Sequence, residues 1–343
     1  MEERKEQEQK DLHDPVKALA RYKKTGLMYT AGTGSALAMA SLVPNSTMMS
    51  TFALSCWVGN SCVQGVSHSL HSPLMAMTNA ISGMTIVGGM LQLGGGFLPE
   101  TVPQSLAAGA VALSAINLAG GTIVTKKMLD MFRRPTDPPE YNEYYLVPGV
   151  AAMVGSSTLY ATGLAPACLT PTLALGSALG CVGAISCLSS QETARTGIYV
   201  GMSGIGTGIV ATLAYMHPEM TGAGGGLGYY VSTKIGPTEL PEAVAAFHSL
   251  VGLAATFTAV GDYMAHDPSI PLSSFHNLAC YLGAWMGSIT FTGSCVAYGK
   301  LSGKLDSGAL ALPGRDYINM GLGGASALGM ATFMATSSPA LGA

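Results

Sequence analysis

Charged residues are scarce in this sequence. Only 10% of its 343 residues are Asp, Glu, Lys or Arg, against about 25% in an average soluble protein. Tryptophan is also rare, with two residues, and aromatic residues together make up 7%. Soluble globular domains and nucleic-acid-binding surfaces both need more charge, so this composition argues against both classes and against a nucleic-acid partner.

Small and apolar residues are abundant instead. Hydrophobic residues make up 48% of the chain, 45 residues are Gly and 20 are Met, and the mean hydropathy is +0.38. Small residues allow transmembrane helices to approach closely where no hydrophobic effect drives them together, and Met fills irregular gaps. The composition therefore predicts an all-α integral membrane protein, a polytopic bundle packed through Gly, Ala and Ser.

Cysteine and histidine show no spacing that is typical of a metal site. The seven cysteines form no C-x-x-C motif and lie in or beside apolar segments, so we expect small buried hydrophobic residues rather than disulfides. His68 and His71 share a short turn, while Asp262, His266 and Asp267 fit a solvated helix end. We expect no metal and no cofactor, although bound lipid is expected.

Apolar segments long enough to cross a membrane recur along the chain. A span needs about 20 mostly apolar residues, and the sequence predicts about eleven such helices and no β-sheet. The predicted spans cover residues 26–43, 47–69, 73–97, 102–125, 145–164, 171–189, 196–216, 219–234, 241–263, 275–299 and 317–336.

Polar segments divide these spans into parts. Residues 1–25 form a charged, soluble tail that lacks the apolar core of a signal peptide, and this tail is the best candidate for docking a partner. The front membrane part, residues 26–125, contains four helices. A polar connector, residues 126–144, leads to a back part of seven helices at residues 145–336. Residues 337–343 form a short C-terminal tail.

The positive charges predict how the bundle is oriented. If the N-terminus lies inside and the spans alternate, all 16 Lys and Arg residues fall on inside segments, as the positive-inside rule requires. An odd number of spans then places the C-terminus on the other side. Arg133 and Lys300 at opposite ends of the bundle would contradict this prediction.

Several ordered motifs resemble one family. Residues 71–83, which run from His71 through Asn79 to Gly83, closely resemble the signature of the front membrane part of proton-translocating nicotinamide nucleotide transhydrogenases. Residues 115–121 and 128–142 look like the connector of the fused eukaryotic type.

The back part carries further motifs of the same family. Residues 240–255, with His248 at their centre, are similar to the span that carries the proton-path histidine. Residues 290–300 and 312–315 match the next span and its loop. The resemblance extends from about residue 20 to residue 325.

The resemblance implies a proton path through the membrane that is coupled to hydride transfer between NAD(H) and NADP(H) in two soluble domains. An ionisable imidazole fits such a path, because His changes charge near neutral pH and a titratable group inside a membrane is costly unless it has a function. If the path is retained, we expect it to use His248, Ser249, Asn79, Asn117 and Glu242.

Each of these polar residues also has a simpler explanation. His248 could be a passive buried imidazole, and Asn79 and Asn117 could serve only to join helices by hydrogen bonds. Glu239 and Glu242 also fit the acidic first turn of a helix. The sequence leaves these alternatives open.

The chain departs from the family pattern in two respects. It is expected to lack both nucleotide-binding domains, because its glycine clusters at 204–208 and 222–228 lie inside apolar spans with no strand before them. The resemblance also implies three further spans, one of which carries an Asn that faces the histidine, and we expect the chain to lack them. We therefore expect no catalysis of hydride transfer by the chain alone.

Three functions are compatible with these features, and a fragment of a longer protein would show the same departures. The departures favour a non-catalytic structural or accessory subunit of a larger respiratory-type complex. The alternative is a proton-translocating membrane subunit of a split transhydrogenase, with the missing spans and nucleotide domains on other chains. A third is an autonomous proton channel.

The expected location is the mitochondrial inner membrane. The N-terminus and the Lys/Arg loops would lie on the matrix side, and the C-terminus on the intermembrane-space side. The expected partners are membrane lipid and other membrane subunits that cover the face around His248.

Overall fold

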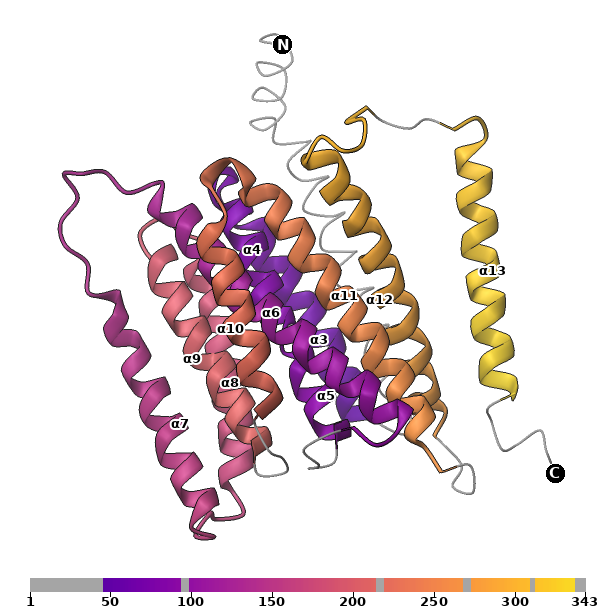
Figure 1. Cartoon of the computed structure of the whole chain (residues 1–343), viewed down its shortest axis with the longest axis horizontal. Helices are drawn as coiled ribbons and strands as arrows, with labels where there is room; N and C mark the ends of the chain where they lie inside the picture. The colour runs from indigo at the N-terminus through magenta and orange to yellow at the C-terminus, as the bar shows by residue number, and fades with distance from the viewer. Residues whose placement is uncertain (1–45, 94–98, 214–218, 268–272, 309–311, 337–343) are drawn as a thin grey trace, which may run out of the picture. The chain divides into compact units, whose positions relative to one another are not determined.

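The computed structural model describes a chain built of helices (Figure 1). No β-strand occurs among the described residues, so the predicted all-α class is confirmed there. The predicted tail at 1–25, the span at 26–43 and the tail at 337–343 lie outside this part of the chain. The described residues are 46–93, 99–213, 219–267, 273–308 and 312–336.

The chain divides into two compact units, residues 1–61 and 62–343. In the first unit the structure describes one helix, α3 (Ser46–Gln64), whose last residues extend past the boundary. Apolar side chains such as Leu54 and Trp57 lie exposed on it. The second unit holds all the other helices and is described by itself below.

The second unit contains ten α-helices and three short 3-10 helices among the described residues. Their bounds are η1 (His68–Leu70), α4 (His71–Ser82), α5 (Thr85–Leu93), α6 (Val102–Asp130), η2 (Asn142–Tyr145), α7 (Leu146–Ala161), α8 (Leu169–Cys187), α9 (Ala194–Leu213), α10 (Glu219–Lys234), η3 (Pro237–Glu239), α11 (Leu240–Ala265), α12 (Ser274–Leu301) and α13 (Arg315–Thr336).

Four helical stretches of the described chain are long and apolar enough to cross a membrane: His68–Leu93, Val102–Asp130, Leu169–Cys187 and Pro237–Ala265. Helices also occupy the other predicted spans from residue 47 onwards, although they do not meet the same test of length and hydropathy. The number of about eleven spans therefore stays a prediction.

The span predicted at 73–97 is formed by two consecutive helices, α4 and α5, within the apolar stretch His68–Leu93. At the break the Gly83 N–H donates to the Ala80 carbonyl (3.0 Å) instead of continuing the i→i−4 pattern. The Asn79 carbonyl accepts from the Ser82 hydroxyl (2.6 Å) and from the side-chain amide of Asn117 on α6 (2.7 Å). A donor 38 residues away thus stabilises the break.

Helices α6 and α11 form the centre of the second unit. α6 packs against α4, α5, α10 and α11, while α11 packs against α4, α5, α6 and α12. A capping box starts α6: Thr101 Oγ1 accepts from the Gln104 N–H, and Gln104 Oε1 accepts from the Thr101 N–H. Residues of the predicted front and back parts therefore belong to one unit.

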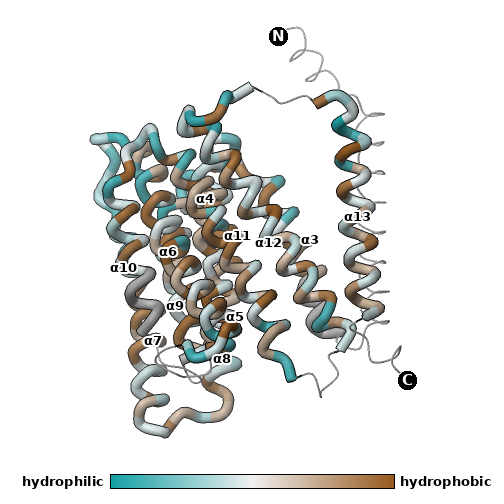
Figure 2. Tube along the Cα trace, turned by 45° about the vertical axis from the view of Figure 1, so that its right-hand side comes forward, coloured by the Kyte–Doolittle hydropathy of each residue, from teal (hydrophilic) through white to brown (hydrophobic). Residues whose placement is uncertain are grey.

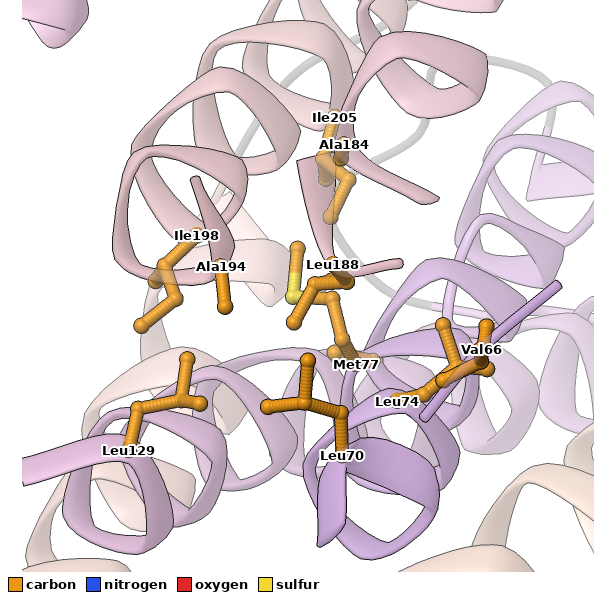
Figure 3. Packing of buried hydrophobic residues seen from close by; sticks show 11 residues of the cluster. Val66, Leu70, Leu74, Met77, Leu129, Ala184, Leu188, Ala194, Ile198 and Ile205 are labelled. Atoms are coloured by element: carbon orange, nitrogen blue, oxygen red, sulfur yellow. The ribbon is translucent and has the colours of Figure 1, made fainter. Parts of the chain in front are cut away.

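A cluster of buried apolar side chains joins η1 and α4 to α8 and α9 (Figure 3). Leu70 and Met77 are at most 1% exposed and meet Leu188 and Ile198, which are at most 2% exposed. Met77 lies in the middle of the cluster, where its flexible thioether fills the gap between the helices. The cluster fixes α9 against the front part of the chain.

Glycines set the closest helix approaches. A Cβ added at Gly180 of α8 would lie 2.6 Å from the Gly204 Cα of α9, and one at Gly252 of α11 would lie 2.6 Å from the Phe291 nitrogen of α12. The glycine cluster at 204–208 supplies one such contact through Gly204, and the cluster at 222–228 supplies another through Gly228, where an added Cβ would overlap the Ile116 backbone of α6. Small residues allow this approach without a hydrophobic driving force.

The segments predicted to lie inside meet at one end of the second unit. Gln191 Nε2 donates to Ser69 Oγ (2.8 Å), and Arg195 forms an ion pair with Glu140 (2.6 Å). Lys127 Nζ, at the end of α6, donates to three backbone carbonyls at the end of α10, those of Ser232 (2.8 Å), Thr233 (3.2 Å) and Ile235 (2.7 Å). Hydrophilic residues gather at the helix ends, and the helix bodies are more apolar (Figure 2).

Lys300 lies at this same end. α12 runs antiparallel to α11, because His248 contacts Ser294 while Asp262 contacts His276. The last turn of α12 therefore returns to the end where α11 begins. The prediction that Arg133 and Lys300 share one end of the bundle is confirmed, whereas the membrane side that this end faces stays a prediction.

We expect Lys127→Ala to lower the free energy of unfolding by about 1.5–3 kcal/mol, the range for hydrogen bonds to a charged group. The ammonium of this half-buried lysine binds the Ser232 and Thr233 carbonyls in the last turn of α10, which lack a partner within the helix, and the Ile235 carbonyl just after it. The neighbouring Lys126→Ala is the control, because Lys126 makes only an exposed pair with Asp130, worth about 0.5 kcal/mol. Denaturant titration in detergent compares the two, and equal losses would contradict the prediction.

Candidate functional site

Helix α11 packs against α6 on one face and against α12 on another. Phe247, 3% exposed, packs against Gly120 of α6 so closely that a Cβ on Gly120 would overlap the ring. Ala243 and Val251, one turn before and after it, are buried on the same side. This contact fixes the rotation of α11 and turns the next residue, His248, toward α12.

His248 is joined to α12 by a hydrogen bond. Its Nδ1 lies 3.0 Å from the hydroxyl oxygen of Ser294, which is 8% exposed. The imidazole itself is exposed on the surface of the second unit. Sequence reasoning selected His248 but missed Ser294, although Ser294 lies within the motif at residues 290–300.

The two predicted asparagines form a second polar group beside the same turn of α11. Asn117, fully buried, donates to the Asn79 carbonyl (2.7 Å), and Asn79 Nδ2 approaches the Val244 carbonyl of α11 (3.4 Å). In a regular helix the Val244 carbonyl accepts the N–H of His248. The asparagine pair therefore reaches the turn that carries the histidine. The Asn117 Oδ1 is buried and has no hydrogen-bond partner within the described residues.

The structure does not bring Ser249 and Glu242 into either group. Ser249 Oγ donates to the Ala246 carbonyl of its own helix (2.7 Å). Glu242 is half-buried in the first turn of α11, where a carboxylate complements the helix dipole. Within the described part of the chain neither residue shares a hydrogen bond with His248 or the asparagines. Glu239 accepts the Gly236 N–H (2.8 Å), as expected for a capping residue.

Close packing of α11 on α12 holds the histidine and the serine in register. Gly252, one turn after His248, faces Gly287 and Phe291 at backbone contact distance. Thr256 Oγ1 and Ser288 Oγ approach to 3.4 Å one turn further along. The pair can therefore pass a proton between imidazole and hydroxyl, because an imidazole accepts at one nitrogen and donates at the other.

Comparison with known proteins identifies the family of this chain. A family model described as "NAD(P) transhydrogenase beta subunit" matches residues 170–342, half of the chain. The chain belongs to this family. A second model, described as "4TM region of pyridine nucleotide transhydrogenase, mitoch", matches residues 48–134. The resemblance inferred from the motifs is confirmed, and the family and the apolar helices together place the chain in a membrane.

The matching relatives include two alpha subunits of NAD(P) transhydrogenases, each similar over part of the chain. The NAD(P) transhydrogenase subunit alpha of Cereibacter sphaeroides is 45% identical over 109 residues, which are 31% of this chain and 20% of that protein. The subunit alpha of Haemophilus influenzae is 44% identical over 118 residues, 32% of this chain and 22% of that protein. The chain thus spans about a fifth of the length of the curated relatives it matches.

The candidate site draws on both matched regions of this transhydrogenase-family chain. His248 and Ser294 lie within the beta-subunit match, while Asn79 and Asn117 lie within the 4TM match. The hydrogen bond from Asn79 to the Val244 carbonyl joins the two. The polar residues of the site are therefore assembled across the boundary between the two matches.

Proposed function

We propose that this chain is a proton-translocating membrane subunit of an NAD(P) transhydrogenase, whose remaining spans and nucleotide domains are supplied by other polypeptides. The observation that supports this proposal best is the His248–Ser294 hydrogen bond between α11 and α12, inside the segment that matches the beta subunit. Histidine titrates near neutral pH, and the adjoining hydroxyl can both accept and donate a proton.

The burial of the polar groups supports the same function. Asn117 is fully buried, and its Oδ1 has no hydrogen-bond partner among the described residues. A buried amide oxygen of this kind can bind water, and water beside the His248 turn would extend a proton path. His248 is exposed on the second unit, and an ionisable group facing lipid is costly. We therefore propose that another membrane subunit covers this face.

The accessory role expected from the sequence receives less support. A purely structural subunit needs no paired histidine and serine, yet the chain holds this pair in register by glycine contacts. The predicted location in the mitochondrial inner membrane, the eleven spans and the matrix-facing Lys/Arg end belong to the same proposal.

Native purification tests this function. The tagged chain would be purified from its own membrane in mild detergent, its partners identified by mass spectrometry, and the complex reconstituted into liposomes. Hydride transfer from NADPH to an NAD⁺ analogue would be followed together with the signal of a pH-sensitive dye. We expect hydride transfer that moves protons and that accelerates when an uncoupler collapses the gradient.

Two results would overturn the proposal. An intact complex without hydride transfer, containing respiratory subunits and no nucleotide-binding polypeptide, would establish the accessory role. Proton conduction by the purified chain alone, at the rate of the complex, would establish an autonomous channel.

A further inference from the structure

Three side chains with different donor atoms converge where α11 ends and α12 begins. Asp262 lies in the last turn of α11, while His276 and Cys280 lie one turn apart in the first turns of α12. Residues four apart on a helix lie on one face, so both α12 side chains point toward Asp262. One carboxylate oxygen, one ring nitrogen and one sulfur all lie within 4.8 Å of one another.

The three donor atoms lie close to the spacing found in the coordination shell of a small metal ion. The Asp262 carboxylate oxygen Oδ2 lies 2.9 Å from His276 Nε2 and 3.6 Å from Cys280 Sγ. An ion bound tetrahedrally at 2.0–2.3 Å from each donor places the donors about 3.3–3.7 Å apart. Small side-chain movements would therefore complete the shell, with a fourth position left for water.

The group formed by Asp262, His276 and Cys280 is buried on the side of the thiol and open to solvent on the side of the carboxylate and imidazole. Cys280 is 6% exposed, whereas the side chains of Asp262 and His276 are 40% and 36% exposed. His276 Nε2 is buried and makes no hydrogen bond among the described residues, and its 2.9 Å contact with Asp262 Oδ2 is an ion pair only when the imidazole is protonated. A solvated helix end does not explain a thiol and an unsatisfied ring nitrogen that both point at one carboxylate.

We propose that Asp262, His276 and Cys280 bind a first-row transition-metal ion, for which Zn²⁺ is the best fit. Thiolate and imidazole ligands favour Zn²⁺ over the hard ions Mg²⁺ and Ca²⁺, which prefer oxygen. The ion would join the last turn of α11 to the first turns of α12, at the opposite end of these helices from Lys300. The site is separate from the His248–Ser294 pair and does not depend on the proposed function.

Cobalt provides a direct test, because Co²⁺ bound to a thiolate shows an intense sulfur-to-metal charge-transfer band that oxygen and nitrogen ligands do not give. The full chain, purified in detergent under reducing conditions and stripped with a chelator, would be titrated with Co²⁺. We expect a band that saturates at one ion per chain and that disappears when Zn²⁺ is added.

Substitutions assign the ligands. Cys280→Ser should abolish the band, and Asp262→Asn and His276→Gln should each weaken Co²⁺ binding about tenfold or more, since even an outer-shell partner contributes that much. Cys295→Ser is the matched control, because Cys295 lies exposed on the same helix outside the group. It should leave the band unchanged.

Other outcomes would overturn the site. Wild-type protein without a charge-transfer band, or a band that survives Cys280→Ser, would show that the three residues form only a hydrogen-bonded group. Loss of the band in Cys295→Ser would place the ion elsewhere. Helical circular dichroism identifies a misfolded variant, and His276→Gln, a polar replacement of similar reach, then provides an independent test of the same site.

Discussion

Replacement of His248 with alanine is expected to lower coupled proton translocation by the reconstituted complex by about 10²–10⁴-fold, the contribution typical of a positioned proton-transfer group. The imidazole is held 3.0 Å from Ser294 Oγ, and no other residue at this contact titrates near neutral pH. Ser294→Ala should cause a smaller loss, because a water molecule can replace a hydroxyl but cannot replace an ionisable ring.

Thr292→Ala is the control for both substitutions. Thr292 is exposed on the same helix and donates only within it, to the Ser288 carbonyl (2.9 Å) and more weakly to the Ile289 carbonyl (3.3 Å). The rate of the dye signal per assembled complex is the measurement, with assembly checked by size-exclusion chromatography. Full proton translocation by an assembled His248→Ala complex would remove the histidine from the path.

Gly252→Val is expected to separate α11 from α12 and to lower the free energy of unfolding by about 1–3 kcal/mol or more, the usual cost of overpacking. A Cβ at Gly252 would lie 2.6 Å from the Phe291 nitrogen and 2.9 Å from the Gly287 carbonyl oxygen. Both atoms belong to the backbone, so no side-chain rotation can relieve the clash. Because His248 lies one turn away, proton translocation should fall as well.

Gly293→Ala on α12 isolates the effect of this contact. A Cβ at Gly293 meets nothing within 4 Å, and alanine favours a helix over glycine by about 1 kcal/mol. Denaturant titration in detergent should therefore show unchanged or higher stability for this variant. Equal destabilisation of the two variants would mean that helix proximity at Gly252 is not what matters.

Composition and charge placement predicted the coarse fold, because both follow from the membrane environment. Apolar length located the helices, and the positive-inside rule placed Arg133 and Lys300 at one end. The break between α4 and α5 could not be found in this way. It depends on Asn117, a donor from a distant helix, and no local pattern around Gly83 specifies that contact.

The sequence predicted only the part of the candidate site that one residue indicates by its own chemistry and motif. His248 stood out as an ionisable residue inside an apolar span, and its motif resembled a known family. Ser294 is one of many serines in the chain, and only the antiparallel packing of α11 and α12 selects it. Likewise Asp262 was grouped with His266 and Asp267, its neighbours in sequence, whereas its contacts in space are His276 and Cys280.

The contact between Lys127 and the end of α10 has a consequence for the order in which the protein is made. Lys127 leaves the ribosome more than a hundred residues before the carbonyls of Ser232 and Ile235. Until those carbonyls are synthesised, the ammonium group of Lys127 can be hydrated by water. The end of α10 gains these hydrogen bonds only when it docks beside α6, so this contact cannot form before residue 235 has been synthesised.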